Sequence, residues 1–427
     1  MIGNLISTTA ARLLIALGNL AILIIATRYI GAAGIGTVSL LILGISINQM
    51  VSSFVGGSVL VYLVPRHALL PLLLPSAIWA IFVSFTVSWV LKLFGLVPTE
   101  LFIHLIGLSL LQAGLTISQN VLLGKEKVLL FNAIALLQTA TMLSAIIVLM
   151  AGMHHHTVMA YVKGLYASFG LAMLSSSFFM LKYVKKARLI EPGLIRQLFR
   201  FGGYLQSASL MQLFNYRLSY YIIEKSFNRA TLGLFSIGVQ VAESLWIVSR
   251  SIAMVQYSRI SNSNDPVANS KLTIDFIKLT TIITLSMLAI LLILPASFFT
   301  FIFSRGFEQV TAVLLSLSPG ILAVAVSNMF SHYFSGSGQP WHNTISSGIG
   351  LVFTVILGFS LIPVMGVTGA GLTASVAYLS GMLYQIVVFK RATGTSLRNF
   401  IPRPQELSAA WSILKHSISS KDKRARQ

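Results

Sequence analysis

The sequence predicts an all-α integral membrane protein with about twelve transmembrane helices in two six-helix bundles. Composition is the first reason: 56% of the 427 residues are hydrophobic, only 9% are charged, and the mean hydropathy is +0.84. A soluble domain would carry roughly a quarter charged residues. The second reason is that apolar runs of about twenty residues, the length of a membrane-spanning helix, recur along the whole chain. The third is a short internal repeat, described below.

Twelve apolar runs define the predicted spans, and the loops between them are short. The eighth and ninth predicted spans are long enough to require tilted helices or protruding ends. The predicted spans are residues 5–27, 35–64, 69–91, 101–123, 128–151, 158–181, 201–223, 232–257, 273–303, 310–334, 343–364 and 367–389.

The repeat divides the chain into two halves. Residues 33–40 enter the second predicted span, and residues 230–237 enter the eighth with a similar pattern of small residues. Six spans per half fit a parallel repeat about an axis normal to the membrane. We therefore expect four domains: an N-terminal bundle (1–181), a cytoplasmic amphipathic linker (182–200), a C-terminal bundle (201–389) and a basic cytoplasmic tail (390–427).

Loop charge predicts the orientation. The net charge is +20, and twenty Lys and Arg residues of the loops and the tail lie on one side of the predicted spans. Cytoplasmic loops are rich in Lys and Arg, so both termini should be cytoplasmic, and the excess charge suits anionic membrane lipids rather than nucleic acid. The opposite side carries only Arg28, Lys92, Lys225, Arg229 and Arg305.

The linker and the tail each contain an amphipathic pattern. Pro192 is followed by apolar residues at helical spacing, with Arg196 and Arg200 four residues apart, which predicts a basic interfacial helix. In the tail, apolar residues at helical spacing predict a second such helix, formed by Leu407, Trp411, Leu414 and Ile418.

Three ionisable residues lie well inside the seventh and eighth predicted spans: Arg217, Glu243 and Arg250. Ionisable groups at this depth are costly unless they face protein, water or each other, so they are candidates for function. Arg217 and Glu243 lie at similar depth, and Glu243 and Arg250 share a helix face because they are seven residues apart. The pattern predicts the lining of a polar cavity.

Three motifs resemble those of the Wzx-type polysaccharide flippases, within the multidrug/oligosaccharidyl-lipid/polysaccharide (MOP) exporter superfamily. They are RYIGAAGIG at 28–36, the stretch from Gly233 through Glu243 to Ser261, and LIPVMGVTGAG at 361–371. The resemblance covers nearly the whole chain. One departure is Ser219, which stands where many members of the family have Asp.

The resemblance implies a MATE-like transporter fold and a transporter rather than an enzyme. The implied cargo is an undecaprenyl-pyrophosphate-linked oligosaccharide, as in O-antigen synthesis, moved from the inner to the outer leaflet of the bacterial cytoplasmic membrane by alternating access. The implied partners are a polysaccharide polymerase or glycosyltransferases of the same pathway. Two alternatives remain open: a cation-coupled exporter of drugs or small metabolites with the same fold, and a membrane glycosyltransferase, polymerase or ligase.

Such a cargo needs cations for its pyrophosphate, because guanidinium forks match phosphate oxygens in a low-dielectric cavity. For Arg12 and Arg217 the alternative is a structural ion pair, and for Lys163 it is snorkelling to the interface. Glu243 either holds an arginine in a buried pair or titrates and couples proton entry to turnover. The pyrophosphate candidates are Arg12, Arg217, Arg250 and Lys163.

Sugars need amide hydrogen bonds and aromatic faces. Amides within spans also join neighbouring helices, so this structural role is the alternative for each of them. The sugar-binding candidates are Asn48, Gln49, Gln212, Asn215, Tyr216, Tyr220 and Trp246. The run of histidines at 154–156 lacks ordered spacing and a carboxylate, and the chain has no cysteine, so we expect no metal site and no cofactor. The coupling ion, proton or sodium, is left open.

Overall fold

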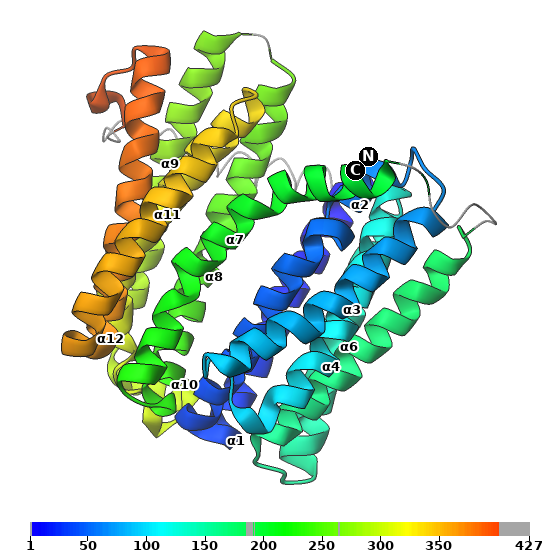
Figure 1. Cartoon of the computed structure of the whole chain (residues 1–427). Coiled ribbons are helices and arrows are strands. Elements are labelled where there is room, and N and C mark those ends of the chain that lie inside the picture. Colours follow the sequence, from blue (N-terminus) through cyan, green and yellow to red (C-terminus); the bar gives the residue numbers. More distant parts are fainter. Residues whose placement is uncertain (1, 185–190, 192, 264, 401–427) are drawn as a thin grey trace, which may run out of the picture. The chain divides into compact units, whose positions relative to one another are not determined.

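The structure is a computed structural model that describes residues 2–184, 191, 193–263 and 265–400. Within these residues every regular element is a helix, as predicted (Figure 1). The expected helix of the tail lies outside the described residues. The helices are α1 (Ile2–Gly56), α2 (Val59–Leu63), α3 (Leu70–Leu93), η1 (Thr99–Leu101), α4 (Phe102–Gly124), α5 (Val128–Ile146), η2 (Ile147–Gly152), α6 (Val158–Leu181), α7 (Leu194–Ser226), α8 (Arg229–Ser261), α9 (Pro266–Ile293), α10 (Ala296–Phe303), η3 (Arg305–Phe307), α11 (Val310–Gly336), α12 (Trp341–Thr393) and η4 (Leu397–Phe400).

α1 and α12 each contain two spans joined at a glycine. They run for 55 and 53 residues, about 80 Å if straight, which is more than twice the thickness of a bilayer core. Gly31 in α1 has φ 66° and Gly366 in α12 has φ 59°, a conformation that glycine adopts without a steric penalty. Each glycine therefore turns the chain directly from one span into the next. Both belong to motifs on which the family resemblance rests.

Nine helical stretches of the described chain are long and apolar enough to cross a membrane, and two of these are 53 residues long. The kinks in α1 and α12 divide each of those two stretches into two spans. The remaining span is α7, a helix of 33 residues that carries many polar side chains. The described residues thus contain about twelve spans, which confirms the predicted fold class.

The ninth predicted span differs from the structure. Residues 273–303 do not form one tilted helix, because α9 ends at Ile293 and α10 begins at Ala296. Leu294 between them is extended (φ −64°, ψ 127°) since the ring of Pro295 disfavours a helical conformation in the preceding residue. At its other end, α9 is capped by Asp265, whose carboxylate accepts hydrogen bonds from the backbone N–H groups of Val267 and Ala268.

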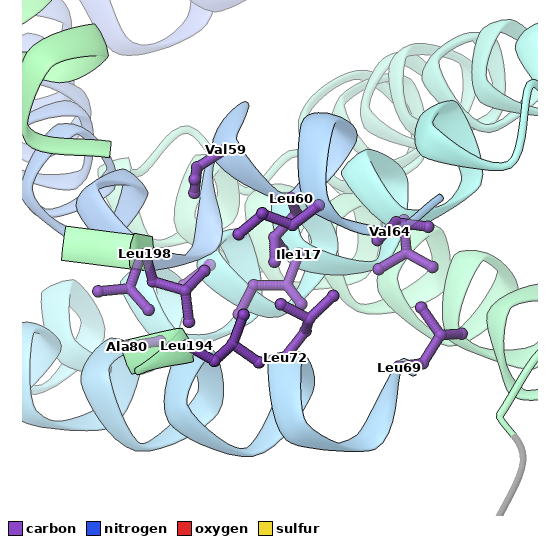
Figure 2. Close-up of a cluster of buried hydrophobic side chains, with 13 residues drawn as sticks. Val59, Leu60, Val64, Leu69, Leu72, Ala80, Ile117, Leu194 and Leu198 are labelled. Carbon is purple, nitrogen blue, oxygen red and sulfur yellow. The ribbon is translucent and has the colours of Figure 1, made fainter. Parts of the chain in front are cut away.

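The start of α7 is anchored in a buried apolar cluster formed by α1, α2, α3 and α4 (Figure 2). Leu194 and Leu198, four residues apart on one helix face, are almost completely buried among residues such as Leu60 and Leu72. Arg196 and Arg200 on the same stretch are exposed. α7 therefore begins beside α2 and continues without interruption into the seventh span (Figure 1).

The contacts divide the described chain into two compact units. The first runs to Ser236 and includes Ala296–Val310, and the second comprises Ile237–Pro295 and the residues from Thr311 onward. α7 and the first turns of α8 thus belong to the first unit. The expected bundles at 1–181 and 201–389 are a different division, based on the repeat, and remain a prediction.

Candidate functional site

The polar side chains of α7 are ordered by contacts along the helix. Gln212 Nε2 donates a hydrogen bond to Tyr216 Oη at 2.9 Å, one turn further on. Arg217 Nη1 donates to Tyr220 Oη at 3.1 Å, and the guanidinium carbon lies 5.1 Å from the centre of the Tyr220 ring. Tyr220 is itself buried, with its ring nearly perpendicular to that of Phe235. A packed aromatic side chain thus orients a half-buried guanidinium inside a predicted span.

A second group lies on α8, in the second unit. The guanidinium of Arg250 is 5.8 Å from the centre of the Trp246 ring. Trp246 is buried, and its indole N–H donates to the carbonyl of Ile321 at 3.2 Å. Arg250 is exposed and Glu243 is half-buried on the same helix. As on α7, an arginine within a predicted span rests on a ring that tertiary packing holds in place.

The other predicted site residues lie apart from these two groups. Arg12 on α1 and Lys163 on α6 are both exposed. Asn48 is buried, and its amide nitrogen donates to the carbonyl of Gly44 and to Ser88 Oγ on α3. Gln49 donates to Ser53 Oγ one turn away on α1. Asn48 therefore joins α1 to α3, the structural role that was its alternative.

The roles in binding stay predictions for all of these residues. Asn215 is buried on α7 and Tyr216 is half-buried, whereas Gln212 is exposed. Arg217 belongs to the first unit and Glu243 to the second. The expected pairing of Arg217 with Glu243, and the expected cavity lined by both halves, therefore also remain predictions.

The internal repeat marks a close helix crossing within the first unit. Gly36 lies so close to α8 that a Cβ atom there would collide with the carbonyl oxygen of Arg229. A Cβ atom at Gly233 would collide in the same way with the carbonyl oxygen of Ala32. The two contacts are related by the repeat, because Arg229 precedes Gly233 by four residues, as Ala32 precedes Gly36. We call this contact the Gly36–Gly233 crossing.

One turn beyond these glycines the two helices are joined by a buried hydrogen bond. Ser39 Oγ donates to Ser236 Oγ at 2.9 Å, and Ser236 in turn donates to the carbonyl of Gly233. Ser39 and Ser236 are again equivalent positions of the repeat. The small residues that form the repeat are therefore the residues at which α1 and α8 touch.

Two arginines form further contacts in the same unit. Arg28 donates from Nε and Nη2 to the carbonyls of Ile302 and Phe301, at 3.0 and 2.8 Å, and so caps the C-terminal end of α10. Arg229 Nη1 donates to the carboxylate of Glu100 in η1 at 3.2 Å. Both arginines belong to the five cations of the weakly charged side, which is the outer side in the predicted orientation.

Sequence reasoning missed these two contacts. Arg28 opens the first family motif, and Glu100 is one of only ten acidic residues in the chain, so both carried a signal. Neither signal indicates the contact partner, because Arg28 meets backbone carbonyls more than 270 residues away. Every residue has a backbone carbonyl, so the sequence does not show which carbonyl an arginine will contact.

Comparison with known proteins decides the family. Residues 68–312, more than half of the chain, match the family described as "Polysaccharide biosynthesis protein". The chain belongs to this family. No curated protein sequence matches the chain significantly.

Several solved transporters share the fold of this polysaccharide biosynthesis protein. The lipid II flippase MurJ in an inward closed conformation has a TM-score of 0.73 at 15% identity, over 94% of this chain and 89% of its own. An inward-facing multidrug resistance MATE transporter of the MOP superfamily has a TM-score of 0.67 at 15% identity, over 90% and 96%. A MOP superfamily transporter from Pyrococcus furiosus has a TM-score of 0.57 at 15% identity, over 91% and 97%.

These findings confirm the resemblance to Wzx-type flippases of the MOP superfamily and the MATE-like fold. The polysaccharide biosynthesis protein is a multi-pass membrane protein that shares its fold with solved transporters and with a lipid flippase. Identities of 15% show the shared fold alone, so the cargo has to be argued from this chain's own residues.

Proposed function

We propose that this protein flips an undecaprenyl-pyrophosphate-linked oligosaccharide across the bacterial cytoplasmic membrane by alternating access. Two findings support this cargo: the family belongs to polysaccharide biosynthesis, and the fold is that of transporters. A surface polysaccharide is built on a lipid carrier whose polar part must cross the bilayer. Its apolar tail can stay in lipid, so the protein has to accommodate only the sugars and the pyrophosphate.

The observation that carries the proposal is the oriented guanidinium of Arg217. The Tyr220 hydroxyl accepts a hydrogen bond from one of the five N–H groups of Arg217. The centre of the tyrosine ring lies 5.1 Å from the guanidinium carbon. An arginine held in one direction loses less conformational freedom when it binds a phosphate with paired donors. Arg250, placed over Trp246, provides a second guanidinium of the same kind.

The remaining residues have subordinate roles in this proposal. Arg12 and Lys163 attract the anion at the two ends of its path, and the amides and rings of α7 contact the sugars. Glu243 either keeps an arginine in place or carries the coupling proton. We place the protein in the inner membrane with both termini in the cytoplasm; reporter fusions in the 182–200 linker that report a periplasmic location would contradict this orientation.

The experiment compares three variants in a strain whose surface polysaccharide depends on this protein. Arg217→Lys preserves the charge but removes the paired donors, so transport should fall while membrane abundance is unchanged. Arg217→Ala should abolish transport. If Arg217 and Glu243 are partners, the double variant Arg217→Ala/Glu243→Gln should restore any lost abundance but not transport, because it neutralises the carboxylate that Arg217→Ala leaves behind without rebuilding the anion site.

Flipping is measured as accumulation of inward-facing lipid-linked oligosaccharide, together with membrane abundance. Arg259→Ala is the matched control, since Arg259 is an exposed arginine at the end of α8. Recovery of transport in the double variant would show that Arg217 is only a structural partner. Normal transport by Arg217→Lys would show that any cation suffices.

A further inference from the structure

An apolar groove lies between α3 and α4, away from the residues proposed to bind the cargo. Its volume is about 550 Å³, and it is lined by Phe85, Thr86, Trp89, Val90, Phe102 and Ile106. The one hydroxyl of this lining, that of Thr86, already donates to the carbonyl of Phe82 at 2.7 Å. The groove wall therefore favours a hydrocarbon over a polar ligand.

The groove opens on the face of α3 that is turned away from the protein interior. Large apolar side chains along this face are more than half exposed, including those of Ile78, Phe82, Phe85, Trp89 and Leu93. In a membrane-spanning helix such a face meets acyl chains rather than water. The medium around the groove is therefore lipid, and the remaining question is which lipid group it selects.

A lysine lies at one end of the groove, and its positive charge favours an anionic lipid head group. The ammonium of Lys92 lies 4.4 Å from the centre of the Phe102 ring and 5.6 Å from that of Trp89, and both rings line the groove. Among the described residues Lys92 has no hydrogen-bond acceptor and no ion-pair partner. The aromatic faces hold the cation in place, but its N–H donors remain available for an anionic oxygen.

The length of the groove matches the head-group phosphate and the upper part of one acyl chain of a phospholipid. Lys92 stands at the end of α3, and Phe85 lies two turns earlier, so the groove extends about 10 Å from the ammonium toward the middle of the helix. A phosphate at the ammonium would therefore place the upper part of an acyl chain against Phe85 and Ile106. Charged residues at helix ends lie at the level of the lipid head groups, which fits this arrangement.

We propose that this groove is a binding site for an anionic phospholipid of the surrounding bilayer. One acyl chain occupies the groove of α3 and α4, and the phosphate of the head group accepts hydrogen bonds from Lys92. The site is independent of the proposed cargo site and would hold a lipid in any functional state of the transporter.

The test measures binding of phosphatidylglycerol to the purified full-length protein in detergent, by native mass spectrometry. Lys92→Ala should weaken binding about fivefold, the effect of one lysine on an anionic lipid, and Lys92→Arg should retain it. Binding of phosphatidylcholine, whose phosphate charge is offset by its choline cation, should change less than binding of phosphatidylglycerol. Thermal unfolding of each variant establishes that it is folded, and Lys92→Gln replaces Lys92→Ala if the latter is not.

Lys182 provides the matched control. Its ammonium also lies over two rings, 5.4 Å from Phe178 and 5.2 Å from Phe179, but these residues are not part of the groove. Lys182→Ala should leave phosphatidylglycerol binding unchanged. An equal loss in both variants would overturn the proposal, because binding would then follow overall charge alone. No loss in Lys92→Ala would also overturn it, because Lys92 would then not bind the head group.

A second measurement locates the acyl chain. Phosphatidylglycerol with a photoreactive group in its chain should label peptides that contain Phe85–Val90 and Phe102–Ile106, and Val90→Trp, which fills the groove, should suppress the labelling. Labelling spread evenly over the exposed apolar faces would contradict a specific site. Displacement of the label by undecaprenyl phosphate but not by excess phosphatidylglycerol would assign the groove to the carrier lipid instead.

Discussion

At the scale of single residues, the hydroxyl of Tyr220 is the atom that directs the proposed anion-binding arginine. Tyr220→Phe removes the acceptor for Arg217 Nη1 but keeps the ring beneath the guanidinium. The loss of one such hydrogen bond costs about 1 kcal/mol, so the protein should stay folded while the arginine loses its direction. We expect normal membrane abundance and a several-fold lower rate of lipid-linked oligosaccharide flipping.

Tyr384→Phe is the control for this prediction. Tyr384 is a half-buried tyrosine of α12 whose hydroxyl lies 2.8 Å from His342 Nδ1, far along the chain from the residues proposed to bind cargo. The Tyr384→Phe variant loses a comparable hydrogen bond and should transport normally. Equal transport in both tyrosine variants would mean that orientation by Tyr220 is not required.

At the scale of elements, the Gly36–Gly233 crossing depends on the absence of side chains. Gly36→Ala and Gly233→Ala each force a Cβ atom into a backbone carbonyl, and overpacking of this kind typically costs about 1–3 kcal/mol. Gly348 in α12 has open space where a Cβ would stand, so Gly348→Ala should be neutral or stabilising by about 0.4–1 kcal/mol. Thermal unfolding in detergent should therefore show a clear loss for the crossing variants only. If all three variants unfold alike, α1 and α8 are not in such close contact in the protein.

At the scale of the whole molecule, the crossing offers a test of alternating access. Ser39 and Ser236 touch through their Oγ atoms at 2.9 Å, and the chain contains no cysteine that could interfere. Ser39→Cys/Ser236→Cys should therefore form a disulfide under oxidising conditions. If the halves must separate here during transport, oxidation should stop flipping and reduction should restore it.

The control for this prediction is a disulfide inside the N-terminal bundle. Ser118 on α4 and Ser176 on α6 are buried and hydrogen-bonded through their Oγ atoms. Ser118→Cys/Ser176→Cys should cross-link equally well but leave flipping intact, because these helices belong to one half. Transport by the oxidised Ser39→Cys/Ser236→Cys protein would show that the crossing does not open.

The sequence by itself was sufficient for the number and the approximate position of the spans. A bilayer requires about twenty apolar residues for each helix, and this requirement is visible residue by residue without knowledge of any contact. It also placed a turn between residues 27 and 35 and another between residues 364 and 367, whereas only the structure shows that Gly31 and Gly366 make these turns. The break at Leu294–Pro295 shows the limit, because a proline within an apolar run can either bend a helix or end it.

Tertiary structure alone decided what each polar residue inside the spans contacts. Asn48 and Gln212 looked alike as amides in apolar runs, yet Asn48 is buried against α3 while Gln212 is exposed beside Tyr216. Arg28 likewise found its partners in the backbone of a helix more than 270 residues away. The physical reason is that apolarity and length are properties of a local segment, whereas a hydrogen bond or an ion pair depends on which distant segment packs against it.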